Sequence, residues 1–218
     1  DVEQLFEAGY DAAVLAVGLH ASRLLSIPGA EEPECEWPGV MGAVEFLRQV
    51  NLGERPDWRG RRVIVVGGGS TAMDTARFCR RMGAEVTIVY RRSRAEMPAH
   101  DFEVEDAERE GVTLRLLTNP ACILRASPDG AVEAVECLQM RLGEPDESGR
   151  RRPIPIEGSE FTLPADTVLL AIGQTSDLSL LPQDGSTSSP QGGTVTQRRG
   201  IVAQAHEQGT RQLVDRVV

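Results

Sequence analysis

Short runs of apolar residues alternate with amphipathic segments through the middle of the chain. Residues 62–66 and 85–90 are apolar and rich in β-branched side chains, which predicts two buried strands. Between them, residues 73–82 carry apolar positions at helical spacing, and Gly83 follows where a helix would end. The three segments together predict one β-α-β unit of about 30 residues, the length that this motif requires.

The same alternation continues on both sides of this unit. Apolar positions at helical spacing predict helices over residues 39–50 and 101–110. Further buried strands are predicted over residues 11–17, 112–117 and 166–172. Strands that alternate with helices in this way predict an α/β fold with a Rossmann-like parallel sheet.

The pattern changes between residues 119 and 161. Short alternating segments at residues 121–126, 132–141 and 154–162 are separated by turns that contain Pro, Asp and Gly. These segments predict an antiparallel β-meander with an exposed hairpin tip at residues 147–152.

The composition changes once more beyond residue 181. Residues 181–200 are rich in Ser, Gln, Gly and Pro, which predicts a flexible loop or a disordered segment. The last segment, residues 201–218, is a candidate helix.

The overall composition is that of a globular α/β protein. Of the 218 residues, 40% are hydrophobic and only 4% aromatic, so the core must consist mainly of Val, Leu, Ile and Ala. The net charge of −10 disfavours nucleic acids and anionic membranes as partners. No apolar run approaches the roughly 20 residues of a transmembrane helix. We therefore expect a cytoplasmic protein that binds neither nucleic acid nor membrane.

The residue types that are present exclude several kinds of catalysis. All 23 basic residues are Arg, which excludes a Walker-type phosphate lysine and a Schiff-base lysine within this chain. The four cysteines form no Cys-x-x-Cys pair, and their wide spacing with only three His disfavours metal or iron–sulfur sites. Cys35, Cys79, Cys122 and Cys137 are therefore predicted to be reduced and structural, and no catalytic acid, base or nucleophile is assigned.

The segment after the first strand of the β-α-β unit has the composition of a phosphate-binding turn. Gly67, Gly69 and Ala72 match the Gly-x-Gly-x-x-Gly/Ala form between a strand and a helix. Gly67 allows a tight turn, Gly69 lets a pyrophosphate approach the backbone, and Ala72 lets the helix pack close to the sheet. The helix N-terminus offers free N–H groups to the phosphates, and the hydroxyl groups of Ser70 and Thr71 are further candidates.

The end of the second strand of this unit predicts which dinucleotide binds. NAD-binding versions place Asp or Glu about 20 residues after the turn, where it accepts a hydrogen bond from the ribose 2′-hydroxyl. This chain instead reads Tyr90-Arg91-Arg92-Ser93-Arg94, and Arg pairs bidentately with phosphate. We therefore predict NADPH, with Arg91 and Arg92 near its 2′-phosphate. Substitution of either arginine by Glu should weaken NADPH binding strongly and NADH binding little.

Long segments of the chain match one family of flavoproteins. The most specific is Gly67-Gly68-Gly69-Ser70-Thr71-Ala72-Met73-Asp74-Thr75-Ala76-Arg77, and the likeness continues from Val86 to Ala99. Further matching segments are residues 9–18, 27–31, 103–111 and 171–174. Over about residues 1–178 the chain resembles the glutamate synthase small (beta) subunit and related NADPH-dependent flavoproteins.

This resemblance implies a flavoprotein with two dinucleotide-binding domains, in which an NADPH domain is inserted into an FAD domain. Residues 1–30 would be a remnant of the FAD-binding domain, and residues 40–165 the NAD(P)H-binding domain. Residues 166–218 would return to the FAD domain and end in a flexible, atypical tail. The strand-end motif at residues 171–174 adds Gly173 to the candidate cofactor-binding residues.

The chain departs from this family at several positions. The FAD-binding glycine motif and the iron–sulfur cysteines expected upstream are absent, Ser70 replaces the usual Asn, and Val17 replaces the usual Thr. Where a Gly-Asp segment should close on FAD, residues 192–197 read Gly-Gly-Thr-Val-Thr-Gln. We therefore expect FAD in the intact protein but not on this chain alone. Because the chain also lacks an initiator Met, we expect it to be part of a longer protein.

Three functions are consistent with these observations. The first, which the resemblance implies, is the NADPH-binding module of an FAD-dependent oxidoreductase that passes hydride from NADPH to flavin. Alone the chain would be inactive, and it would need a missing FAD domain or a partner electron-transfer subunit. The second is an NAD(P)-binding regulatory or subunit-interaction domain without its own turnover. The third is a flavoprotein of the disulfide-reductase type, which the absence of a Cys-x-x-Cys pair disfavours.

Overall fold

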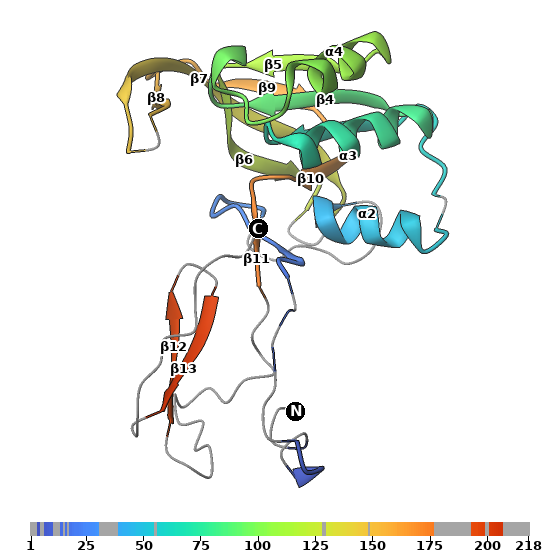
Figure 1. Cartoon of the computed structure of the whole chain (residues 1–218). Helices are drawn as coiled ribbons and strands as arrows, with labels where there is room; N and C mark the ends of the chain where they lie inside the picture. The colour runs from blue at the N-terminus through green and yellow to red at the C-terminus, as the bar shows by residue number, and fades with distance from the viewer. Residues whose placement is uncertain are drawn as a thin grey trace. The chain divides into compact units, whose positions relative to one another are not determined.

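The computed structural model divides the chain into two compact units, one of residues 1–20 with 175–218 and the other of residues 21–174 (Figure 1). All of the predicted site residues lie in the unit of residues 21–174. The structure describes residues 4, 7–10, 14, 16, 18–30, 39–54, 56–127, 130–147, 149–176, 193–198 and 201–206.

A five-stranded sheet forms the centre of the unit of residues 21–174. Its strand order is β2-β10-β3-β4-β5, and every pair of neighbours is parallel. The predicted Rossmann-like parallel sheet is thereby confirmed. The strands are β2 (Val40–Gly42), β3 (Arg62–Val66), β4 (Glu85–Tyr90), β5 (Thr113–Leu116) and β10 (Thr167–Leu170).

The parallel sheet is covered on both faces, and the side chains of β3 pack against a different layer on each face. Val63 and Val65 pack in a cluster with residues of the helices, whereas Ile64 and Val66 pack in a second cluster with residues of an antiparallel sheet. This division follows from the strand geometry, because successive side chains point to opposite faces. The helices are α2 (Ala43–Asn51), α3 (Ser70–Arg81) and α4 (Asp101–Arg109) (Figure 1).

The antiparallel sheet confirms the predicted meander, with one difference. It consists of β6 (Thr118–Arg125), β7 (Val132–Pro145), β8 (Arg151–Pro155) and β9 (Phe161–Pro164), and β7 pairs with each of the other strands. The predicted single strand over residues 154–162 is wrong, because a turn at Gly158 separates β8 from β9. Gly158 has a φ of 70°, a left-handed conformation that a strand does not contain.

Two helix boundaries also differ from expectation. The helix predicted over residues 39–50 begins only at Ala43, because Val40 and Met41 belong to β2 and pair with β10. An isolated apolar pair satisfies both the helical and the strand pattern, so only its pairing with a distant segment decides its structure. The helix predicted over residues 73–82 begins earlier, at Ser70, directly after the glycine turn.

The central sheet extends beyond residue 165, the predicted end of the NAD(P)H-binding domain. β10 lies between β2 and β3, and an ion pair of 2.5 Å between Arg62 and Asp166 joins the starts of β3 and β10. Two short strands, β1 (Ala21–Ser22) and β11 (Gln174–Thr175), also pair with each other. Which residues belong to an FAD-binding and which to an NAD(P)H-binding domain stays a prediction.

The unit of residues 1–20 and 175–218 contains an antiparallel hairpin of β12 (Gly193–Arg198) and β13 (Ile201–His206). The loop predicted for residues 193–198 and the helix predicted for residues 201–206 are therefore wrong, whereas the flexibility of the tail stays a prediction. Both strands contain β-branched Thr, Val or Ile, which favour extended backbone. The strand predicted over residues 11–17 falls mostly outside the described residues. No helix in the described ranges is long and apolar enough to cross a membrane.

Candidate functional site

The predicted site residues gather at the carboxyl ends of β3, β4 and β10. Gly67, directly after β3, donates a backbone hydrogen bond to Val89 of β4 at 3.0 Å. On the other side, Ala171 donates to the carbonyl of Val66 at 2.8 Å. β3 is thus flanked by the strand that follows it and by a strand from the end of the unit. Where the strand order of a parallel sheet reverses in this way, a crevice forms at the carboxyl ends of the strands, and ligands bind there.

Each glycine of the turn meets a different constraint. Gly67 has a φ of 144°, and a Cβ at this position would collide with the carbonyl oxygen of Ala171. A Cβ at Gly68 would lie 2.6 Å from the Tyr90 ring. A Cβ at Gly69 would meet no atom within 4 Å. The first two glycines are therefore required by the protein itself, whereas Gly69 borders open space.

Helix α3 starts at this open space. Gly69 is its N-cap, and no side chain caps this end of the helix. The first N–H groups of a helix have no intrahelical partner, and the helix dipole places positive charge at the same end. Ala72 is fully buried in the core cluster beneath the turn, as its small size predicts. The start of α3 therefore has the properties of an anion-binding site.

The two hydroxyl groups predicted at this site have different surroundings. Ser70 Oγ donates to Glu103 Oε2 at 2.8 Å, and the backbone N–H of His100 donates to the same oxygen at 2.8 Å. The His100 amide, together with the Ser70 hydroxyl, lowers the pKa of Glu103. Ser70 is therefore held by the first turn of α4, where the rings of His100 and Phe102 stack at 5.6 Å. The Thr71 hydroxyl makes no hydrogen bond within the described ranges.

The arginines that follow β4 differ in their exposure and in their partners. Arg91 is exposed and makes no hydrogen bond or ion pair with any described residue. Arg92 is only 5% exposed, and its Nη2 donates to Asp146 Oδ2 at 2.5 Å. Arg94 pairs with Glu108 of α4 at 2.8 Å. Three neighbouring guanidinium groups thus have three different surroundings, a distinction that the sequence alone does not make.

Glu96 closes the loop that carries these arginines. Ser93 Oγ and the Ser93 backbone N–H both donate to Glu96 Oε2, and Arg151 Nε donates to its other oxygen at 2.6 Å. The hydrogen bond from the Ser93 hydroxyl, and then that from Arg151, lowers the pKa of Glu96. The sequence contains no signal for the contacts of Asp146 and Arg151 with this loop. Both residues lie more than 50 positions further along the chain, and no motif links them to residues 91–96.

Gly173 lies just beyond β10, at the same edge of the sheet as Gly67. Its φ is 124°, and its carbonyl accepts a hydrogen bond from the backbone N–H of Arg23 at 3.0 Å. A Cβ at Gly173 would lie 3.3 Å from the Arg23 side chain. The family's strand-end motif therefore corresponds here to a constrained backbone position, and its role in cofactor binding stays a prediction.

The cysteines that the structure describes have the surroundings of structural residues. Cys79 and Cys137 are buried, and desolvation raises the pKa of Cys79 above its usual range and that of Cys137 to about 12. Cys122 is partly buried and unpaired, and Cys35 lies outside the described residues. Within the described ranges, no group of His, Cys, Asp and Glu is arranged to hold a metal ion.

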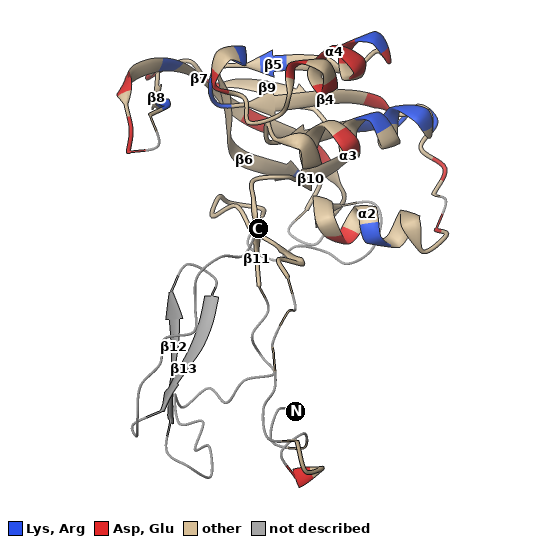
Figure 2. Ribbon diagram, viewed as in Figure 1, with Lys and Arg blue, Asp and Glu red and all other residues tan. Residues whose placement is uncertain are grey.

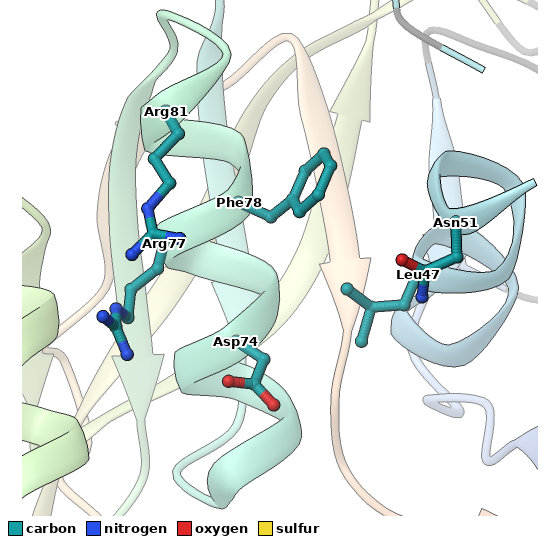
Figure 3. A pocket seen from close by; sticks show the side chains of 6 residues that line it. All are labelled: Leu47, Asn51, Asp74, Arg77, Phe78 and Arg81. Carbon is teal, nitrogen blue, oxygen red and sulfur yellow. The ribbon is translucent and has the colours of Figure 1, made fainter. Parts of the chain in front are cut away.

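A separate cavity of about 290 Å³ lies between α2 and α3 (Figure 3). Its walls combine the apolar side chains of Leu47 and Phe78 with polar and charged groups. None of the predicted site residues lines it, so it is distinct from the glycine turn. The lining residues are Leu47, Asn51, Asp74, Arg77, Phe78 and Arg81.

Comparison with known proteins places this geometry in one family. The sequence pattern of the pyridine nucleotide-disulphide oxidoreductases matches residues 1–206. The NADP(+)-dependent formate dehydrogenase subunit beta of Moorella thermoacetica is 49% identical over 188 residues, which are 86% of this chain and 26% of that protein. The glutamate synthase [NADPH] small chain of Escherichia coli is 38% identical over 175 residues, or 75% of this chain and 36% of that protein. The chain thus spans well under half of these relatives.

The fold is also found among solved structures. FprA of Mycobacterium tuberculosis, in complex with NADPH, superposes with a TM-score of 0.62 and covers 85% of this chain and 54% of its own. At 23% identity this likeness concerns the fold alone. The expected flavoprotein-type architecture and the resemblance to glutamate synthase small subunits are both confirmed.

Proposed function

The chain belongs to the pyridine nucleotide-disulphide oxidoreductase family, and we propose that it is the NADPH-binding module of an FAD-dependent oxidoreductase that passes hydride from NADPH to flavin. One observation supports this most directly. The glycine turn after β3 leads into a helix whose N-terminus has no side-chain cap and borders open space. The neighbouring strand β4 is followed by arginines, where NAD-binding proteins have Asp or Glu.

The residues present at the site are compatible with a bound dinucleotide. The open space beyond Gly69 leaves room for a diphosphate against the backbone, where the N–H groups that begin α3 would donate hydrogen bonds to it. Arg91, at the end of β4, has a free guanidinium for a phosphate group on the adenosine ribose. The proposed cofactor-binding residues are Gly67, Gly69, Ser70, Thr71, Ala72, Arg91 and Gly173. Arg92, predicted beside the 2′-phosphate, is buried and bonded to Asp146, so it would support Arg91 without contacting the cofactor.

These residues would bind and orient the cofactor and would take no covalent part in its reaction. NADPH supplies a hydride when it is bound, and FAD accepts it. Gly67 and Ala72 fix the path of the backbone from β3 into α3, so that the helix N-terminus would face a bound diphosphate. Glu103 accepts hydrogen bonds from the Ser70 hydroxyl and from the His100 amide, which fixes the start of α4 against the turn. A dithiol step is not part of the proposal, because burial raises the pKa values of Cys79 and Cys137.

We further propose that FAD and the electron acceptor are held by other parts of a larger assembly. The matched relatives are much longer than this chain, and those reported above are named as a beta subunit and a small chain. A missing FAD domain or a partner electron-transfer subunit would then complete the enzyme. A cytoplasmic location is part of the same proposal.

Titration calorimetry of the purified chain with NADPH, NADH and FAD tests the binding step. We expect NADPH to bind much more tightly than NADH and FAD not to bind. Equal affinities for the two nicotinamide dinucleotides, or no affinity for NADPH, would contradict the proposal. In the intact protein, bleaching of flavin absorbance by NADPH separates an electron-transfer module from the alternative regulatory domain without turnover.

A further inference from the structure

The hairpin between β7 and β8 reaches the loop of residues 91–96 and interlocks with it. Arg92 of the loop donates from Nη2 to Asp146 and from Nε to the carbonyl of Arg151, at 2.5 and 2.8 Å. Arg151 in turn donates from Nε to Glu96 of the loop at 2.6 Å. Each segment therefore supplies one cation and one anion to the other. Figure 2 shows charged residues of both signs on this hairpin.

Each of these two ion pairs contains a buried charge. Glu96 is only 8% exposed, and Arg92 is buried to a similar degree. A buried charge that loses its partner is strongly destabilising, because it has been removed from water without compensation. The loop has additional internal support, since the Tyr90 hydroxyl donates to the carbonyl of Glu96 at 2.6 Å. The conformation of residues 91–96 in this structure therefore depends on Asp146 and Arg151.

The two arginines at the end of β4 therefore have different roles. The Arg92 guanidinium is directed into the hairpin, where Asp146 and the carbonyl of Arg151 use its donors. Arg91, its neighbour, is exposed and has no partner among the described residues. Arg91 is thus the guanidinium that is presented to a ligand, and Arg92 is the anchor that fixes the backbone from which Arg91 projects.

We propose that the β7–β8 hairpin sets the preference for a 2′-phosphorylated dinucleotide, with Asp146 and Arg151 as positioning residues that hold the 91–96 loop so that Arg91 meets the 2′-phosphate. The inference rests on the proposed NADPH site and adds a specificity element from outside the β-α-β unit. A fixed loop binds more tightly than a mobile one, because its ordering does not have to accompany binding. NADH has no 2′-phosphate, so its affinity does not depend on this ordering.

The test compares Asp146→Asn with a matched variant, Asp166→Asn, in calorimetric titrations with NADP⁺ and NAD⁺. Both aspartates pair with an arginine at 2.5 Å, and their side chains are 24% and 23% exposed. Asp166, however, lies at the opposite end of the sheet, where β3 and β10 begin. For Asp146→Asn we expect NADP⁺ affinity to fall about tenfold, which corresponds to ~1.4 kcal/mol, with NAD⁺ affinity unchanged. For Asp166→Asn we expect the ratio of the two affinities to stay at the wild-type value.

Two further variants keep the inference testable if Asp146→Asn folds poorly. Asp146→Glu keeps the charge and should restore most of the NADP⁺ preference. Arg151→Met breaks the pair with Glu96 from the other side and should lower the preference in the same way. An unchanged or increased NADP⁺ preference in Asp146→Asn or Arg151→Met would overturn the role of the hairpin. A wild-type chain that binds both dinucleotides equally would instead refute the NADPH site itself, so the two failures are distinguishable.

Discussion

The glycine turn of residues 67–72 and the loop of residues 91–96 lie at the ends of adjacent strands, but they are built differently. The turn consists of backbone, and its constraints come from glycine conformation and from the start of α3. The loop consists of charged side chains, and the hairpin that carries Asp146 and Arg151 holds it in place. Under the proposed function, a general affinity for dinucleotides would depend on a local segment, whereas the preference among them would depend on a long-range contact.

This difference predicts separable effects of substitution. Changes in the turn should affect NADPH and NADH alike, because both cofactors carry the same diphosphate. Changes in the loop or its hairpin should affect NADPH alone, because only this cofactor carries a 2′-phosphate. Four experiments test the comparison, starting with the largest expected effect.

Gly69→Ala should weaken the binding of both dinucleotides strongly without unfolding the protein. The backbone at Gly69 has φ −95° and ψ 175°, which any residue adopts, and the new methyl group meets no protein atom within 4 Å. The methyl group would occupy the space proposed for the diphosphate. Two charge-assisted hydrogen bonds of roughly 1.5–3 kcal/mol each would be lost, so both affinities should fall about 100-fold or more. Calorimetric titration measures both affinities, and a cooperative thermal melt shows that the variant is folded, with only the small loss expected for a poorer N-cap residue. Normal binding would show that the diphosphate lies elsewhere.

Gly67→Ala should instead damage the fold. A residue with a side chain is strained at a φ of 144°, and its Cβ would collide with the Ala171 carbonyl, which is part of the backbone. Strain of this kind costs of order 1–3 kcal/mol of unfolding free energy, and the collision adds to it. Urea unfolding measures the loss. Gly53→Ala is a matched control, because Gly53 has a φ of 109° but no atom near its Cβ position. Equal losses for both variants would show that the contact with Ala171 is unimportant.

Arg91→Ala should weaken NADPH binding about 10- to 100-fold, the effect of one charge-assisted hydrogen bond of roughly 1.5–3 kcal/mol. NADH binding should change less than about twofold, because NADH has no 2′-phosphate that would lose its hydrogen bond from Arg91. Arg94→Ala is the control from the same loop, because Arg94 is already paired with Glu108 at 2.8 Å. If Arg94→Ala reduced NADPH affinity more than Arg91→Ala, the assignment of the free guanidinium would be wrong.

Acidification should remove the contribution of Glu96 to stability. Its pKa is lowered in the folded protein, mainly by the Ser93 hydroxyl and then by Arg151. The stabilisation is therefore complete above the unfolded-state pKa of about 4.3 and is lost as the pH falls through the lower folded-state pKa. The unfolding free energy of the wild type should exceed that of Glu96→Gln at pH 6, and the difference should shrink steadily as the pH falls below about 4.3. A difference that persists at low pH would show that Glu96 acts through packing and not through its charge.

Much of the fold follows from local patterns along the chain. The strands at residues 62–66 and 85–90 and the helix from Asp101 are where periodicity places them. The helix between the two strands begins earlier than predicted, at Ser70. Other differences lie where two patterns overlap. Val40 and Met41 fit a helix as well as a strand, and β10 decides between them by pairing with β2. At Ser159, a hydroxyl bonded to the Ile156 carbonyl marks the turn that divides the predicted strand over residues 154–162.

The sequence by itself determined the β-α-β unit and its glycine turn, because the residues that form them are neighbours and act through backbone conformation. The tertiary structure alone decided which arginine at the end of β4 is free and which is anchored. That choice depends on Asp146 and Arg151, which are remote in sequence and reach the loop only when the antiparallel sheet packs beside β4. Charge pairing acts over a few ångströms of space regardless of separation along the chain, so no local pattern records it.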